Sequence, residues 1–437
     1  MNFSRSEACR KPLPGLLLLT AAALHSPALV AQDADPGRLS FADLSADLQL
    51  GIGGSSVDDT TILNLQGGHH DPRKRGFTFQ GLELGLQGAI DPYLSLEAAL
   101  HYTIDAATND SSFEMVEAFL TSSRLPLGLQ DKGIHVEVGQ MLTEFGRHNP
   151  THLHERNWMD EPVINTRIFG SDGMRGLGLR IGMSEPTSWL SRIHLGIQDA
   201  SGQTMTSFNS SITNIVAGEE EEVTIGGIEA FENEVKDLED FVYLLRIEKE
   251  IAGPTGETAW LLGASGLCGP NATGNDGRTI VLGADITMEW TPKENDDGWP
   301  FLTWQTEIMR RKFVLGDGDP DPGNGGGGAI GIGDVTADSL MDWGLYSQVL
   351  WGYEKDWAAG LRYEFATGSS GASDRSLDPY RDNRQRISPV WIWIPTEFSR
   401  IRLQYNYDLA DHITESQAHS IWLGLEVHFG EHATNPH

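Results

Sequence analysis

The most restrictive feature of this sequence is a two-residue alternation of apolar and other side chains, which recurs along most of the chain. Every second residue from Ile421 to Phe429 is large and apolar, and the stretch RIRLQYNYDL behaves in the same way. Period two indicates a β-strand with one apolar face, because an amphipathic helix repeats near 3.6 residues. The chain is therefore predicted to be all-β.

Counting such stretches predicts sixteen strands. Most have the roughly 9–11 residues that a strand needs to cross a membrane. No stretch after the first thirty residues is apolar for as long as a membrane-spanning helix requires. The predicted strands span residues 44–52, 77–88, 93–104, 113–122, 134–142, 175–183, 191–199, 240–250, 258–267, 278–291, 301–314, 342–352, 357–366, 387–394, 398–408 and 419–429.

The connections between these strands predict a transmembrane antiparallel β-barrel of the porin-like, outer-membrane kind. Short connections near 89–92, 183–189, 250–258, 352–357 and 394–399 alternate with long ones at 53–76, 143–174, 200–239, 315–341 and 367–386. Outer-membrane barrels have short periplasmic turns and long external loops. An even strand count then places both ends of the barrel in the periplasm. Aromatic residues cluster near the predicted strand ends, as interfacial girdles do, although strands favour aromatic residues in general.

The two ends of the chain predict export. Arg5, Arg10 and Lys11 precede a short apolar run with an Ala-rich end, so residues 1–31 are expected to be a signal peptide cleaved after Ala31 or Ala28. Residues 32–43 are then a short periplasmic segment, 44–429 the barrel and 430–437 a periplasmic tail. The expected location is the bacterial outer membrane, with its lipid as one partner.

Charge and cysteine content narrow the classes of partner. The chain has 62 acidic and 31 basic residues and a net charge of −31. Such acidity argues against nucleic-acid partners, which require a basic surface, and is compatible with a channel that concentrates cations. Only Cys268 follows the predicted signal peptide, so no disulfide is expected within the mature chain.

If the apolar face of each strand meets lipid, the other face lines the lumen. Opposed acidic and basic rows inside a water-filled channel would screen solutes by charge, whereas the alternative is a network of satisfied ion pairs. The predicted lumen-lining residues are Glu83, Glu97, Glu137, Arg180, Arg246, Asp285, Glu289, Arg362, Glu364, Arg400, Arg402 and Asp408.

The stretch TEFGRHNPTHLHERNWMDEP, within the long loop 143–174, is the densest patch of histidine. It predicts a loop that folds inward as a constriction, through Glu144, Phe145, Arg147, His148, Asn149, His152, His154 and Asp160. His152 and His154 share one face of an extended backbone and, with His148 and Asp160, offer nitrogen and oxygen ligands suited to Zn²⁺. Ordinary hydrogen bonding by these histidines is the alternative. His69 and His70 form a second candidate metal pair.

Other loops carry weaker signals. Asp317, Asp319 and Asp321 resemble a calcium-binding loop, but the final Glu and the flanking helices of an EF-hand are missing. The acidic run Glu219 to Glu222 is expected to be exposed, with a short helix at 226–238.

Three stretches resemble a bacterial outer-membrane family whose members are described as zinc-regulated, TonB-dependent outer-membrane receptors or porin-like proteins. They are GGHHDPRKRGFTFQGLELGLQGAIDPY, GQMLTEFGRHNPTHLHERNWMDEPVINTRIFG and PTEFSRIRLQYNYD. The family pattern FGR-x-NP-x-H-x-H is matched from Phe145 to His154. The resemblance implies expression linked to zinc. TonB-dependent receptors carry a plug domain and a 22-stranded barrel. Barely a dozen residues separate the expected cleavage site from the first predicted strand, so no plug domain is expected.

The leading functional hypothesis is a porin-like channel for small hydrophilic solutes or ions, with a cation or metal preference. A metal receptor without general pore activity, holding Zn²⁺, is the alternative. A hydrolase would need a nucleophile beside a base, and no motif of that kind is found, so no enzyme activity is expected. Association into a homo-oligomer is compatible with the apolar outer faces.

Overall fold

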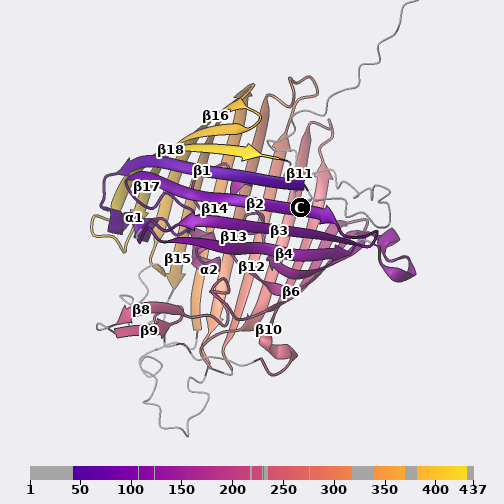
Figure 1. Ribbon diagram of the computed structural model, residues 1–437, viewed down its shortest axis with the longest axis horizontal. Coiled ribbons are helices and arrows are strands. Elements are labelled where there is room, and N and C mark those ends of the chain that lie inside the picture. The colour runs from indigo at the N-terminus through magenta and orange to yellow at the C-terminus, as the bar shows by residue number, and fades with distance from the viewer. Residues whose placement is uncertain are drawn as a thin grey trace, which may run out of the picture.

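The main element of the protein is a closed antiparallel barrel of sixteen strands, which confirms the predicted fold class and strand number. The computed structural model describes residues 43–430, except 107, 123, 217–218, 229, 231–234, 275, 317–338 and 370–380. Strands that follow one another in the barrel order are hydrogen-bonded, with β7 beside β10 and β1 closing the barrel against β18 (Figure 1). The predicted signal peptide and both predicted periplasmic segments lie almost wholly outside the described residues.

Each predicted strand corresponds to one strand of the barrel. The barrel strands are β1 (Asp43–Ser55), β2 (Gly76–Ala89), β3 (Leu94–Ile104), β4 (Ser111–Ser122), β5 (Ile134–Leu142), β6 (Arg175–Thr187), β7 (Leu190–Asp199), β10 (Phe241–Ala252), β11 (Thr258–Pro270), β12 (Arg278–Trp290), β13 (Phe301–Val314), β14 (Ser339–Glu354), β15 (Trp357–Ser369), β16 (Arg384–Thr396), β17 (Ser399–Ala410) and β18 (Gln417–Phe429). The other elements are helices α1 (Asp59–Leu65) and α2 (Val163–Phe169), hairpin strands β8 (Ile212–Val216) and β9 (Glu219–Val223), and 3₁₀ turns η1 (Pro126–Gly128), η2 (Gln130–Lys132), η3 (Leu153–Glu155) and η4 (Leu238–Asp240).

The first and last strands close the barrel in a continuous register. Ala46 lies opposite Phe429, and Ser55 lies opposite Ser420. The start of β1 and the end of β18 therefore share one end of the barrel, which we call the turn end. The connections 56–75 and 143–174 leave the wall at the opposite end, the loop end. This arrangement follows from an even number of antiparallel strands.

The connections differ from the predicted alternation of short and long. At the loop end, residues 105–110, 271–277 and 411–416 form short connections beside the long ones. At the turn end, residues 123–133 form a longer connection that contains η1 and η2. The length of a connection therefore indicates less reliably than the strand count at which end of the barrel it lies. A connection at either end needs only enough residues to reverse the chain.

The predicted helix at 226–238 is wrong for the part of that range the structure describes. Residues 224–228 form a turn after the β8–β9 hairpin, and only η4 adds a 3₁₀ turn at Leu238. The acidic run from Glu219 to Glu222 lies in β9.

The outer face of the barrel is apolar. Large hydrophobic side chains point outward along the wall, among them Phe77, Leu177 and Leu282, which are 79%, 64% and 58% exposed. Leaving such residues exposed to water is unfavourable by roughly 1.5–3 kcal/mol each. Among the described residues, no helix is long and apolar enough to cross a membrane.

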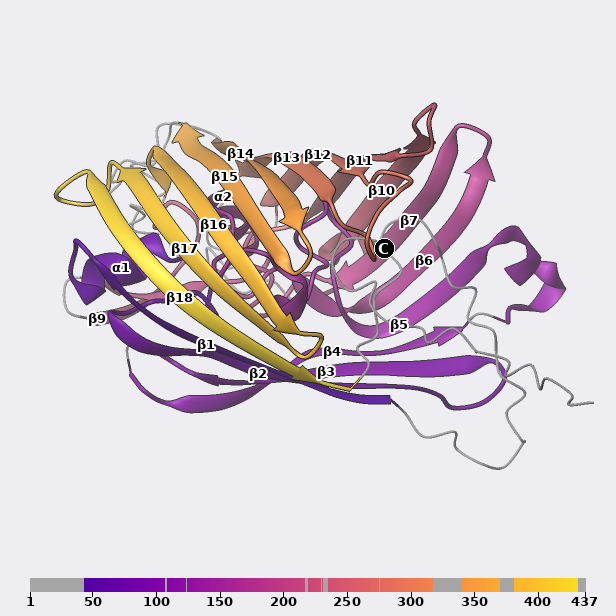
Figure 2. The same cartoon turned by 90° about the horizontal axis from the view of Figure 1, so that it is seen from above.

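The core of the molecule lies inside the barrel. Figure 2 shows α2 within the ring of strands. Its buried side chains Ile164, Ile168 and Phe169 pack with inward-facing residues of the wall. Ile62 and Leu65 of α1 pack with Trp422 of β18 in a second cluster. Two connections, 56–75 and 143–174, thus supply much of the material that the wall encloses.

Candidate functional site

The segment that joins β5 to β6, residues 143–174, runs inside the barrel, and we call it the lumen loop. Asn149 ties its two ends together. The Nδ2 group donates to the carbonyl oxygens of Thr143 (2.7 Å) and Met174 (2.9 Å), and Oδ1 accepts the N–H of Met174 (2.8 Å). Because Asn149 is buried, all three bonds are shielded from water, and the loop leaves and re-enters the wall at one point.

The loop first crosses toward β12. Glu144 is buried beside Arg180, whose Nη1 donates to it over 3.2 Å. Phe145 is fully buried and lies against Gly283, where an added Cβ would come within 2.7 Å of the ring. Glycine at position 283 is therefore what allows the loop to approach the wall so closely.

Two backbone N–H groups that follow hold a carboxylate on β13. The N–H groups of Arg147 and His148 donate to Oε2 of Glu307 on β13, over 3.2 and 3.3 Å, and the hydroxyl of Tyr346 donates to the same atom over 2.9 Å. Gly146 has φ +64°, and a Cβ there would collide with the Glu307 carboxylate. The turn of the loop thus fits this wall residue only with glycine.

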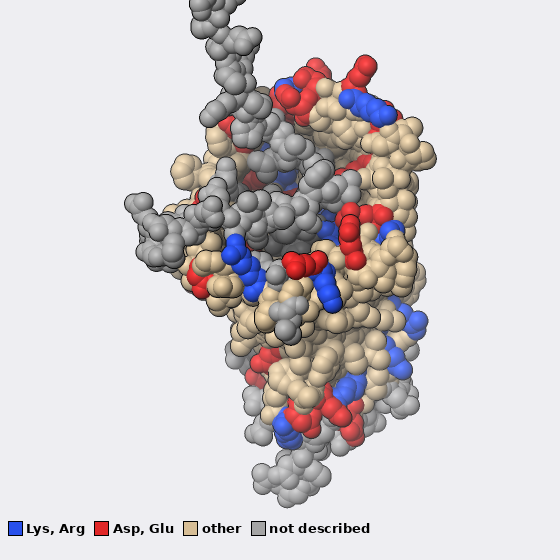
Figure 3. All heavy atoms as spheres, turned by 90° about the vertical axis from the view of Figure 1, so that its right-hand side faces the viewer, with Lys and Arg blue, Asp and Glu red and all other residues tan. Residues whose placement is uncertain are grey.

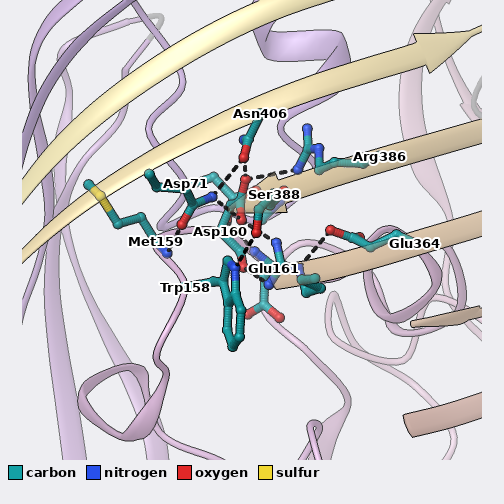
Figure 4. Close-up of polar contacts among 12 residues, drawn as sticks. Asp71, Trp158, Met159, Asp160, Glu161, Glu364, Arg386, Ser388 and Asn406 are labelled. Atoms are coloured by element: carbon teal, nitrogen blue, oxygen red, sulfur yellow. Dashed lines mark hydrogen bonds and ion pairs between the residues drawn. The ribbon is translucent and has the colours of Figure 1, made fainter. Parts of the chain in front are cut away.

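Asp160 is the centre of the second contact, which we call the arginine anchor: Asp160, Arg362, Arg386, Gln404 and Asn406 (Figure 4). Arg362 forms an ion pair with Asp160, and Arg386 donates to it over 2.9 Å. Gln404 and Asn406 of β17 donate over 2.8 and 2.6 Å. Burial would raise the pKa of Asp160, but the two guanidinium groups outweigh it and lower that pKa to about 2.

Residues on both sides of Asp160 strengthen this contact. The indole N–H of Trp158 donates to the carbonyl oxygen of Ser388 over 2.9 Å, and the Arg362 guanidinium lies 5.4 Å from the Trp158 ring centroid. The N–H of Val163, the first residue of α2, donates to Glu364 over 2.6 Å. The loop is therefore held against β15, β16 and β17 by charge, hydrogen bonds and a cation–π contact.

Glu161 forms a separate ion-pair group within the loop, with His148 and Arg156 as partners. Burial would raise the pKa of Glu161, but Arg156 and His148 lower it to about 2. Burial lowers the pKa of His148, although Glu161 acts in the opposite direction.

A third contact holds the loop to β2, β3 and β4, and we call it the histidine anchor: Glu83, His101, Glu117, His152 and His154. Oε1 of Glu83 lies 3.2 Å from Nδ1 of His152 and 3.1 Å from Nδ1 of His154, while Oε2 lies 2.6 Å from Nε2 of His101. Nε2 of His152 also reaches Glu117 over 2.9 Å. One wall carboxylate therefore receives three imidazoles.

The geometry of the two loop histidines comes from η3. Their rings stack with centroids 5.7 Å apart, so they share a face as predicted, although a 3₁₀ turn replaces the expected extended backbone. Burial would lower the pKa of His152, but Glu83 and Glu117 raise it well above its usual value. The pKa of His154 is likewise raised, with Glu83 outweighing burial.

His69 and His70 lie next to each other but have separate partners. His70 contacts the carbonyl oxygen of Gln80 (2.6 Å) and the ring of His101 (3.2 Å), and burial with the neighbouring His101 lowers its pKa to about 3. His69 hydrogen-bonds Asp172 over 3.1 Å, which raises the pKa of His69. His69, Asp172 and Glu114 place one possible metal-ligand atom each within 4.8 Å of one another.

The structure does not bring together the predicted metal-ligand set. Asp160 is occupied by two arginines, and His148 by Glu161, whereas His152 and His154 meet at Glu83. The loop turns inside the barrel between these contacts, so residues that are close in sequence reach different strands. The residues from Asp317 to Asp321, with their calcium-like pattern, lie outside the described part of the chain.

The predicted lumen-lining residues all lie on the inner face. Glu97 and Glu289 are half-buried, and the other ten are buried. Most of the buried ones are in ion pairs, for example Arg246 with Asp285 (2.8 Å). At the level of the lumen loop, the charged side chains of the interior therefore form a network of ion pairs. This is the alternative that the sequence left open beside a water-filled channel lined by unpaired charges. Further pairs are Arg180 with Glu137, Arg362 with Glu364, Arg400 and Arg402 with Glu426, and Asp408 with Arg386.

Several residues of the site were missed in the sequence. Arg384 and Arg386 extend the two-residue alternation of β16, whose predicted start at residue 387 came too late. Asp71, in the 56–75 connection, accepts the N–H of Glu161 over 2.9 Å. Nothing in its local sequence indicates this contact, because the partner lies 90 residues further along the chain.

Comparison with known proteins shows the fold and no more. No family model matches the chain, so the resemblance to zinc-regulated receptors stays a prediction. An uncharacterised protein of Aquifex aeolicus is 24% identical over 402 residues, which cover 84% of this chain and 73% of that protein.

Two solved structures are similar in fold at very low sequence identity. The outer-membrane protein OmpT of Vibrio cholerae, in its trimer form, superposes with a TM-score of 0.52 at 7% identity, covering 90% of this chain and all of that one. An anion-selective porin from Comamonas acidovorans gives 0.51 at 9% identity, covering 89% and 99%. The chain therefore has the closed, sixteen-stranded antiparallel fold of outer-membrane porins.

Proposed function

We propose that the protein is an outer-membrane channel for small hydrophilic solutes, in which the lumen loop is the constriction. The observation that carries this proposal is the path of the loop, which contacts β2 and β4 at one wall and β13, β15 and β17 at the others. A segment that spans a closed barrel at this level decides what passes. The apolar outer face is the surface that such a barrel presents to lipid.

The inner face nearer the turn end has the polarity of a water-filled vestibule. Gln87, Glu97, Glu289, Gln305 and Gln348 are half-buried there, in contrast with the buried groups at the level of the lumen loop. Figure 3 looks onto the turn end and shows acidic and basic side chains on this side of the molecule. Solutes would therefore meet the constriction from a polar chamber.

A modest preference for cations follows from the charges that have no ion-pair partner among the described residues. Glu97 and Glu289 are two such carboxylates on the lumen wall, and Arg147 is such a guanidinium on the lumen loop. Fixed charges that line a water-filled pore attract ions of the opposite sign. We expect Glu97→Gln with Glu289→Gln to lower the cation preference, and Arg147→Gln to raise it.

Single-channel recording in planar bilayers tests the channel. Folded protein should give discrete conductance steps, and a potassium chloride gradient should give a reversal potential that moves in opposite directions in the two variants. Folded, inserted protein without conductance would overturn the proposal. An unchanged reversal potential in both variants would remove the assigned charges from it.

A second candidate, a zinc receptor, is favoured by the three imidazoles around Glu83. Nitrogen and carboxylate oxygen are ligands of zinc. His101 of β3 and His152 and His154 of the lumen loop supply nitrogen, and Glu83 of β2 supplies oxygen. The group of His69, Glu114 and Asp172 is an alternative place for the ion, although Glu114 is also paired with Arg175. Calorimetry with Zn²⁺ on wild type, on His152→Ala with His154→Ala, and on His69→Ala distinguishes the two. Zinc binding that is absent, or equal in all three proteins, rejects both places.

We also propose that the protein associates into a homo-oligomer. The apolar outer face allows two barrels to pack side by side, and the Vibrio cholerae protein of similar fold is described in a trimer form. Light scattering of the detergent-solubilised protein tests it, and a mass of one chain would reject it.

A further inference from the structure

The stretch Arg310-Arg311-Lys312 of β13 divides its three bases between the two faces of the wall. Arg311 points inward, is buried and pairs with Asp342 over 2.8 Å. Arg310 and Lys312 point outward and are exposed. Among the described residues, neither of the two outward bases has a carboxylate partner, and the one contact of Arg310 is with the sulfur of Met341 over 3.8 Å.

The surroundings of these two bases are those of the apolar outer face. Arg310 lies opposite Leu282 on β12 and Trp343 on β14, and Lys312 lies opposite Ile280 and Met341. Leu282, Trp343 and Ile280 are 58%, 41% and 38% exposed. The strands β12, β13 and β14 are side by side in the wall (Figure 1). Two unpaired cations therefore stand on a surface otherwise built for lipid chains.

The position of Arg310 and Lys312 along the barrel axis places them at the edge of the apolar band. Both lie near the end of β13 that leads to the loop end, and Trp343 beside Arg310 is the kind of residue that occupies a membrane interface. Arg278, at the start of β12, adds a third outward base, which is two-thirds buried and lies 3.7 Å from Glu239. Outward bases are otherwise rare in the described wall, and Lys249 of β10 is found near the turn end.

We propose that Arg310 and Lys312 bind the phosphate groups of an anionic lipid of the outer leaflet, whose acyl chains lie over Ile280, Leu282 and Trp343. A base at this height is only slightly unfavourable in a barrel wall, and an anionic headgroup attracts it. Guanidinium and ammonium groups are the usual phosphate donors. The inference rests on the proposed placement in the outer membrane and is independent of conduction.

Native mass spectrometry of the folded, detergent-solubilised full chain provides the test, with diphosphorylated lipid A, its monophosphorylated form and phosphatidylcholine as probes. We expect affinity to fall in that order. Arg310→Gln with Lys312→Gln should bind diphosphorylated lipid A roughly 30-fold more weakly, as expected for losing two basic groups beside an anionic surface. Arg310→Lys with Lys312→Arg keeps both charges and should restore most of the affinity.

Lys249→Gln is the matched control, because it removes an outward-facing base near the other end of the wall. It should leave lipid A binding unchanged. Inorganic phosphate alone should not bind detectably, because it lacks the acyl chains. Equal affinity for the three lipids, an unchanged affinity in the double Gln variant, or an equal loss in Lys249→Gln would each overturn the assignment. Conductance of the same variants is measured separately, so a failure here differs from a failure of the channel proposal.

Discussion

The two anchors of the lumen loop hold it to different parts of the wall, on either side of β1 and β18, with different chemistry. In the arginine anchor, one loop carboxylate, Asp160, meets two wall guanidiniums, Arg362 and Arg386. In the histidine anchor the polarity is reversed: two loop imidazoles meet the wall carboxylate Glu83. Arginine stays charged at every relevant pH, whereas histidine changes its charge between about pH 5 and 8. The first contact is therefore permanent and the second is adjustable.

The largest effect is expected from breaking the arginine anchor with Asp160→Asn. The variant leaves two buried guanidiniums without their loop partner, and removing one side of a buried ion pair costs about 3–5 kcal/mol. The loop should detach from β15 to β17, which trypsin cleavage after Arg147 or Arg156 and a larger single-channel conductance would report. Asp296→Asn changes an exposed carboxylate and is the control. Wild-type cleavage and conductance in Asp160→Asn would show that this contact does not hold the loop.

A smaller effect is expected from Glu83→Gln, which breaks the histidine anchor. Hydrogen bonds to charged groups contribute about 1.5–3 kcal/mol, but the histidines can release their protons, and the amide oxygen can still accept one bond. The loss should therefore be smaller than for Asp160→Asn. Comparing the trypsin cleavage rates of the two variants measures the difference. A larger loss for Glu83→Gln would reverse the ranking of the two anchors.

A still smaller effect is expected at the root of the loop, where Asn149 joins its two ends. Asn149→Ala removes three hydrogen bonds and leaves the N–H of Met174 without its partner, at a cost of about 1–3 kcal/mol. The carbonyl oxygens of Thr143 and Met174 keep the backbone N–H groups of Phe145 and Thr143 as donors. Asn157→Ala is the control in the same loop, because the Oδ1 atom of Asn157 has no hydrogen-bond partner among the residues that the structure describes. Hydrogen exchange of the Met174 amide measures the change. Equal exchange in both variants would mean that the anchors alone hold the loop.

The smallest effect is expected from a change of pH, which should weaken one anchor and leave the other intact without any mutation. The raised pKa values of His152 and His154 mean that their stabilisation is complete below about pH 6.5 and is lost as pH rises through the raised values. The lowered pKa of Asp160 means that its stabilisation is complete above about pH 4 and is lost as pH falls through about 2.

Hydrogen exchange checks this, once corrected for the intrinsic dependence of amide exchange on pH. Above neutral pH, amides from Thr151 to Glu155 should exchange faster, while those from Trp158 to Glu161 should not. Uniform acceleration along the loop would show that the two anchors are not independent.

Some of this site was readable in the sequence and some was not. The strict alternation predicted the inward position of Glu83, Arg362 and Asp408, because a strand's period of two assigns each side chain to one face. The loop that carries Asn149 and the histidines was also recognisable. The partner of each group was not, since every anchor joins segments that are far apart in the chain.

The sequence by itself determined the barrel. Sixteen alternating segments leave each strand with one apolar face and paired neighbours on both sides, and only closure satisfies all of them. The tertiary structure decided what the barrel encloses. His152 and Asp160 lie eight positions apart, yet His152 reaches β2 and β4 whereas Asp160 reaches β15 to β17, because the loop turns inside the lumen between them. Alternation depends on neighbours in the sequence, whereas the constriction depends on which wall a flexible connection meets.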